Sequence, residues 1–72
     1  MAAMNKFVKL IKTNFDKQDR SLNNLKVLDV GCFTGDFLYC MHQQGSDVYG
    51  IEYQQKAATI ANQKLPGKII NA

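Results

Sequence analysis

Apolar positions along this 72-residue chain follow two kinds of pattern. In residues 4–19 they recur every three or four positions, which predicts an amphipathic helix. Beyond a polar turn, short runs of β-branched and leucine residues alternate with further helical segments, which is typical of buried parallel strands joined by helices. We expect the first helix to pack through the face that carries Met4, Phe7, Val8, Leu10, Ile11 and Phe15.

The rest of the chain predicts three strands that alternate with two helices. We expect strands at residues 26–30, 47–52 and 68–72, and helices at residues 35–44 and 54–65. Two right-handed crossovers place these strands in the order 3-2-1. The predicted fold class is therefore α/β: an N-terminal helix followed by β-α-β-α-β, which is half of a doubly wound parallel sheet and is truncated relative to the full fold.

Signals at the helix ends refine this prediction. Thr34 is the expected N-cap of the second helix, Asp36 suits the positive end of its dipole, and Gly45 is a suitable residue to end it. The third helix is expected to lie close to the sheet through a face of small side chains. That face carries Ala57, Ala58, Ile60 and Ala61.

Length and composition predict a single small domain. Residues 1–24 would form the amphipathic helix and a turn, and residues 25–72 the half sheet. The apolar fraction of 46% is ordinary for a folded chain, and the net charge of +3 is spread along it, which disfavours a nucleic-acid partner. Neither a membrane span nor a signal peptide is evident, so we expect a cytoplasmic protein.

Cysteine usage gives no indication of a metal site. Cys32 and Cys40 have only His42 to join them, which leaves a zinc ligand set incomplete. A disulfide between the two is conceivable, but two free thiols fit a reducing compartment better. We therefore predict no metal ligands.

The segment at residues 26–38 carries the chemistry of this chain. A strand stops at Gly31, and the backbone turns and re-emerges at Gly35 before a helix, an arrangement that lets backbone approach a nucleotide-like ligand. A triphosphate loop would need a lysine where Asp36 stands, and a dinucleotide loop would need G-x-G-x-x-G. Asp36 would also repel a pyrophosphate at the helix start.

Two acids favour a different ligand. Asp29 lies at the end of the first predicted strand, where a carboxylate can bind an ammonium group. Glu52 ends the second strand, at the position that faces a ribose in this topology. An adenosine with a zwitterionic amino-acid tail offers an ammonium group for Asp29 and a ribose for Glu52.

At these residues the chain resembles the class I S-adenosylmethionine-dependent methyltransferases. Residues 27–35 are similar to that family's first motif, an acid followed by G-x-G-x-G: Gly31 and Gly35 match the outer glycines, and Phe33 stands in place of the middle one. Residues 50–53 resemble the second motif.

The resemblance implies S-adenosylmethionine or S-adenosylhomocysteine as the cofactor. Glu52 would hold the two ribose hydroxyls, Tyr53 would flank the adenine, and the backbone at Gly31, assisted by Asp29, would meet the methionine part. The cofactor-binding set implied for this chain is Asp29, Gly31, Cys32, Phe33, Gly35, Glu52 and Tyr53.

The resemblance implies the N-terminal, cofactor-binding portion of a methyltransferase. Because the family's acceptor site comes from later segments, we predict no catalytic residue here and no turnover by the isolated chain, and the methyl acceptor is not indicated. A non-catalytic Rossmann-like binding or assembly module is the alternative, and the glycine spacing disfavours a nucleotide-binding oxidoreductase. The open edge of the first strand, or the N-terminal helix, predicts self-association.

Overall fold

The computed structural model describes the backbone of residues 2–72 and the side chains of residues 4–72, which form three helices and three strands in alternation. In chain order these elements are α1 (Ala2–Lys17), β1 (Lys26–Val30), α2 (Asp36–Gln43), β2 (Asp47–Glu52), α3 (Gln55–Lys64) and β3 (Ile69–Asn71). The predicted α/β order of a helix followed by β-α-β-α-β is confirmed.

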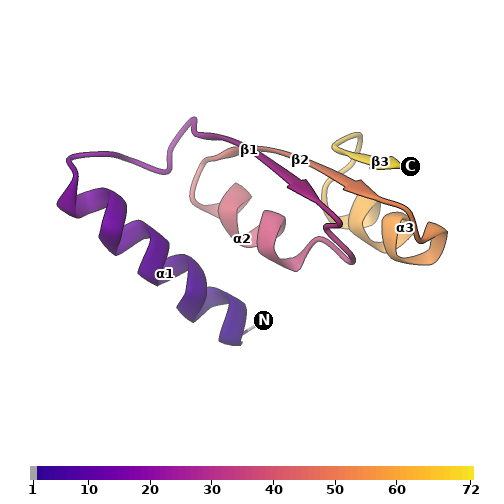
Figure 1. Cartoon of the computed structure of the whole chain (residues 1–72), viewed down its shortest axis with the longest axis horizontal. Coiled ribbons are helices and arrows are strands. Elements are labelled where there is room, and N and C mark those ends of the chain that lie inside the picture. The colour runs from indigo at the N-terminus through magenta and orange to yellow at the C-terminus, as the bar shows by residue number, and fades with distance from the viewer. Residues whose placement is uncertain (1) are drawn as a thin grey trace.

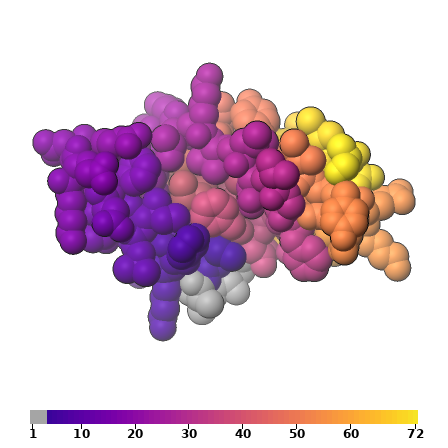
Figure 2. Space-filling model, in the orientation of Figure 1, coloured from indigo at the N-terminus to yellow at the C-terminus, as the bar shows by residue number. Residues whose placement is uncertain are grey.

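The three strands form one parallel sheet in the order β1-β2-β3, as predicted. Asp29 of β1 lies beside Gly50 of β2, and Glu52 lies beside Asn71 of β3. All three helices lie on the same side of this sheet (Figure 1). The molecule is elongated, 38 × 23 × 16 Å, with the N-terminal helix at one end and the C-terminal segment at the other (Figure 2).

The start of α2 differs from the prediction. Gly35, in a left-handed conformation with φ of 80°, is its N-cap, and no side chain caps the helix. Thr34 is thus not the cap: the chain needs a positive φ at the residue next to the helix, which glycine supplies without steric cost. At the other end the expectation holds, since Gly45 follows α2 with φ of 88°.

The core is one-sided, because it lies between the sheet and the helices. Leu38 of α2, Val48 of β2 and Ala61 of α3 are almost fully buried. Of the small face predicted for α3, the alanines are buried but Ile60 is exposed. The other buried members of this core are Val8, Leu22, Cys32, Cys40, Met41, Ala58, Leu65 and Ile69.

The N-terminal helix buries less than its apolar stripe predicts. Val8 is buried, but Phe7 and Leu10 are 53% and 65% exposed, so the prediction that the whole stripe is packed is wrong. The reason is that α1 contacts mainly α2, a short helix that covers only part of a wide stripe; Phe7 meets Phe37 with ring centroids 5.9 Å apart. No helix among the described residues is long and apolar enough to cross a membrane.

The opposite face of the sheet is uncovered. Strand alternation and register place Leu28, Val30, Tyr49 and Ile70 on this side, and all four are exposed, Val30 at 73%. We call this set the bare face. The first strand, predicted to be buried, is thus covered on its helix side alone, because no described element packs against the bare face.

Gly50 is closely packed on the covered face. A Cβ atom there would lie 2.7 Å from the Cys32 Sγ, 2.8 Å from the Leu38 Cδ1 and 2.9 Å from the Ile69 Cδ1. We expect Gly50→Ala to lower the free energy of unfolding by about 2 kcal/mol through overpacking, measured by urea denaturation. Adding Ile69→Val, which removes that Cδ1, should recover part of the loss. A Gly50→Ala chain as stable as the wild type would contradict this packing.

Candidate functional site

The loop between β1 and α2, residues 31–35, is fastened across the end of β2. The Gly31 N–H donates to the Ile51 carbonyl oxygen (2.7 Å), and the Cys32 N–H donates to the same oxygen (3.1 Å). At its far end the loop closes on itself, because the Gly35 N–H donates to the Cys32 carbonyl oxygen (2.9 Å). The loop is therefore a defined turn held to the neighbouring strand.

Glu52 joins this loop to the start of α3. Its side chain is only 3% exposed; Oε1 accepts the Phe33 N–H and Oε2 accepts the Gln54 N–H, both at 2.8 Å. Charge-assisted bonds of this kind are stronger than neutral ones, and they compensate a carboxylate for lost water. The acid predicted to face the ribose thus holds together the two segments that would surround a nucleoside.

Phe33 keeps the backbone of the glycine it replaces. Its φ is 52°, in the left-handed region, and its ring is exposed. This conformation costs a residue with a Cβ about 1 kcal/mol, which the hydrogen bond to Glu52 can offset. The middle position of the motif therefore adopts the backbone conformation that glycine favours, although its residue is phenylalanine.

The two remaining glycines of the loop have different surroundings. At Gly31, φ is 78° and a Cβ would meet nothing within 4 Å, so this stretch of backbone is open. At Gly35, φ is 80° and a Cβ would lie 3.1 Å from the Cβ of Ala61 in α3. Gly31 therefore presents backbone for a ligand to approach, whereas Gly35 is packed against the protein.

Asp29 lies on the same face of the sheet as Glu52. Asp29 is in register with Gly50, and alternation puts Gly50 and Glu52 on the helix side of β2. The Cys32 thiol lies against Gly50, between the two acids. Burial raises the pKa of Cys32, and the negative charges of Asp29 and Glu52 raise it further. Together with burial, the charges of both acids therefore keep this thiol protonated at neutral pH, and a protonated thiol is a poor nucleophile.

Partial burial also affects Asp29 itself. Desolvation raises the pKa of its carboxyl above the ordinary value of 3.8. Since no cation of the described residues contacts this carboxylate, a bound ammonium group would supply the missing countercharge.

Both cysteines are free and buried.

The structure thus brings most of the predicted residues together. Asp29, Cys32 and Glu52 gather beneath the loop that carries Gly31, Phe33 and Gly35. Tyr53 follows Glu52 directly and is 75% exposed, and its Oη accepts a weak hydrogen bond from the Gln54 Nε2 (3.4 Å). What these residues bind stays a prediction.

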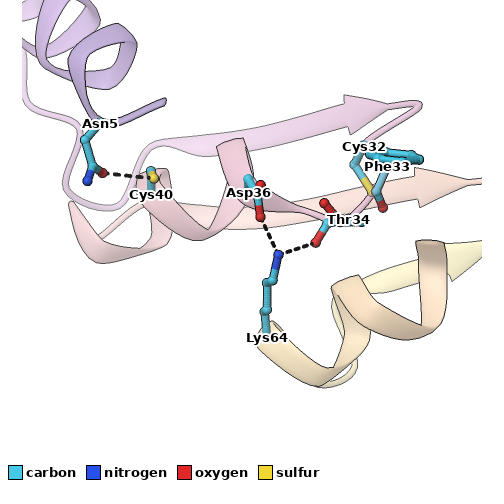
Figure 3. A network of polar contacts seen from close by, with 7 residues as sticks. All are labelled: Asn5, Cys32, Phe33, Thr34, Asp36, Cys40 and Lys64. Carbon is cyan, nitrogen blue, oxygen red and sulfur yellow. Dashed lines mark hydrogen bonds and ion pairs between the residues drawn. The ribbon is translucent and has the colours of Figure 1, made fainter. Parts of the chain in front are cut away.

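Sequence reasoning missed Lys64. This residue at the end of α3 donates from Nζ to the Thr34 carbonyl oxygen (3.0 Å) and forms an ion pair with Asp36 (Figure 3). Asp36 therefore repels anions less than the sequence alone predicts, because its carboxylate is paired with Lys64. The position of Lys64 in the last helical turn gives no sequence signal beyond a general preference for cations there.

Two surface hollows lie outside the loop. One of about 270 Å³ lies between α1 and α2, beside Asn5, Lys9 and Gln44. The other, of about 500 Å³, follows α3. Neither hollow is lined by residues of the loop or by Asp29 and Glu52.

Comparison with known proteins agrees with this geometry. No curated protein matches the chain. The fold is similar to a crystal structure of a TehB-like SAM-dependent methyltransferase from Corynebacterium glutamicum, with a TM-score of 0.58 and 21% sequence identity over 97% of this chain. The matched region is 44% of that protein, so this chain spans less than half of its length.

The methyltransferase domain family matches residues 28–72, which include the loop and both acids. This match confirms the resemblance to SAM-dependent methyltransferases, and it extends over more than half of the sequence. The chain belongs to the methyltransferase domain family.

Proposed function

We propose that this chain binds S-adenosylmethionine or S-adenosylhomocysteine along the ends of β1 and β2, as the cofactor-binding part of a methyltransferase. The observation that carries the proposal is the bond between the buried Glu52 carboxylate and the Phe33 N–H. It makes the glycine loop and the acid that ends β2 one unit, so that a ligand at the loop also lies near the acid.

The residues of this unit fit the parts of the ligand. Gly31 offers open backbone to the methionine part, and Asp29 offers a half-buried carboxylate to its ammonium. Each oxygen of Glu52 accepts one amide and has a further lone pair with which to accept a ribose hydroxyl. Tyr53 has an exposed ring that can stack on adenine.

The cofactor, when bound, would supply a methyl group on a sulfonium. Transfer then depends on holding this methyl in line with an acceptor in a pocket closed to water. The described residues form one open wall of such a pocket. We therefore propose that the chain alone binds the cofactor without turnover and that acceptor recognition lies in other residues.

A second candidate function is a non-catalytic binding or assembly module. It is favoured by the same Glu52, because both carboxylate oxygens already accept backbone amides and so serve the fold without a ligand. Ligand titration separates the two candidates.

The first test is binding of S-adenosylhomocysteine, followed by calorimetry and amide chemical shifts. We expect shifts at Gly31 and Phe33, and none with NAD at the same concentration. Tyr53→Ala should weaken binding about tenfold through lost stacking. Tyr49→Ala, which removes an exposed tyrosine from the bare face, is the matched control and should bind normally. Absence of binding by the wild type would favour the assembly module.

A second prediction concerns Asp29. Between pH 3.8 and its raised pKa, Asp29 keeps a proton in the folded chain that it has released in the unfolded chain, so the contribution of this residue to stability falls as the pH rises through this window. We expect Asp29→Asn to be more stable than the wild type at pH 7, with the difference closing as the pH falls to 3.8.

The same substitution should weaken S-adenosylhomocysteine binding, since it removes the partner of the ammonium. Binding of 5′-methylthioadenosine, which lacks the amino-acid tail, serves as the control and should be unaffected. Thermal unfolding across pH measures the first effect, and calorimetry measures the second. An Asp29→Asn chain that is less stable at pH 7 and binds the amino-acid ligand normally would refute this role.

We also propose that a second copy of this chain covers the bare face. In support, Val30 lies both on this face and on β1, whose outer edge is unpaired among the described strands. Exposed apolar edges of this kind recruit other chains. Two copies that stack bare face on bare face around a twofold axis would bury this patch from both molecules.

Light scattering over a range of concentrations tests this association. We expect the wild-type chain to form dimers and Val30→Lys to shift the equilibrium to monomers. Leu10→Lys, at a similarly exposed apolar position on α1, is the matched control; dimer loss with it alone would instead indicate exchange of the N-terminal helix. A wild-type monomer at high concentration would rule out both routes.

A further inference from the structure

We infer that Lys64 is a positioning residue for the glycine loop, and that it prepares the loop for a ligand that bears a carboxylate. This inference rests on the proposed function. Lys64 lies outside both sequence motifs, at the end of α3, and its side chain reaches back to the junction of the loop with α2 (Figure 3).

The junction of the loop with α2 is held by contacts from α3. Lys64 contacts the Thr34 carbonyl oxygen and the Asp36 carboxylate, the residues on either side of Gly35. Ala61 lies one helical turn earlier on the same side of α3 and packs against Gly35 itself. Since α3 thus holds Gly35 by packing and both its neighbours by polar contacts, the last turn of the loop has little freedom to move.

The charges of Asp36 and Lys64 also affect a ligand at the loop. Asp36 stands in the first turn of α2, beside the loop that would receive the methionine part of the ligand. An unpaired carboxylate there would repel the ligand's own carboxylate. The Lys64 ammonium offsets that charge. Because the two side chains are 31% and 42% exposed, water screens the pair, and a modest effect on affinity is expected.

The chain contains a matched control pair. Lys68 forms an ion pair with Asp47 (3.6 Å), and both side chains are 38% exposed, much like Lys64 and Asp36. This pair lies at the start of β2, whereas the loop lies at the strand ends. Removing Lys68 therefore deletes the same charge and a similar ion pair, together with its contact to the Tyr49 ring (4.6 Å to the centroid), without touching the loop.

The experiment compares Lys64→Met, Lys64→Arg, Lys68→Met and the double variant Asp36→Asn/Lys64→Met. The first measurement needs no ligand: it is hydrogen exchange of the Gly35 amide, whose bond to the Cys32 carbonyl closes the loop. We expect faster exchange in Lys64→Met than in the wild type. Lys64→Arg and Lys68→Met should exchange as the wild type does.

The second measurement is ligand affinity. We expect Lys64→Met to weaken S-adenosylhomocysteine binding by about threefold to fivefold, and 5′-methylthioadenosine binding by less. Asp36→Asn/Lys64→Met should recover most of the loss for the first ligand, because the repelling carboxylate is gone. Lys64→Arg should retain binding.

The outcomes distinguish this inference from the proposed function. Unchanged Gly35 exchange in Lys64→Met, or an equal effect of Lys68→Met, would overturn the positioning role. Equal losses for both ligands would overturn the charge argument. If the wild type binds neither ligand, the proposed cofactor function fails, whereas the exchange measurement still decides whether Lys64 holds the loop.

Discussion

The two hydrogen bonds accepted by the Glu52 carboxylate are the interaction on which the rest of the site depends. A buried carboxylate is stable only where donors replace the lost water, and here two backbone amides do so. Because those amides belong to Phe33 and Gln54, the acid determines where the loop ends its turn and where α3 starts. The left-handed backbone at Phe33 is maintained by this bond.

Packing beneath the loop complements this polar contact. The Cys32 thiol fills the space left by the missing side chain of Gly50, and Leu38 closes the same space from α2. The loop is thus held from below by close apolar contacts and at its middle by the acid. A thiol kept protonated by burial and by two neighbouring acids suits this packing role better than a chemical one.

The strands were predictable because local composition determines them. The bounds of β1 and β2 agree with the sequence prediction, since each is a short apolar run next to turn residues. Motif spacing likewise indicated Glu52 and the loop. Burial was less predictable. The exposure of Phe7 and Leu10 depends on how much surface α2 offers to α1. The exposure of Leu28 depends on which face of the sheet the helices cover. The contacts of Lys64 could not be predicted, because they depend only on how α3 is placed against the loop.

The one-sided core links stability to ligand binding. With all described helices on one side of the sheet, the chain buries apolar surface mainly there, and small domains have little stability in reserve. Several of the contacts that form this core also shape the loop, among them Gly35 against Ala61 and Cys32 against Gly50. A ligand that binds only the folded loop must therefore stabilise the whole chain, since the loop cannot loosen without opening the core. Conversely, the desolvation of Asp29 opposes folding when its carboxyl is charged, and the close packing around the loop must compensate for it.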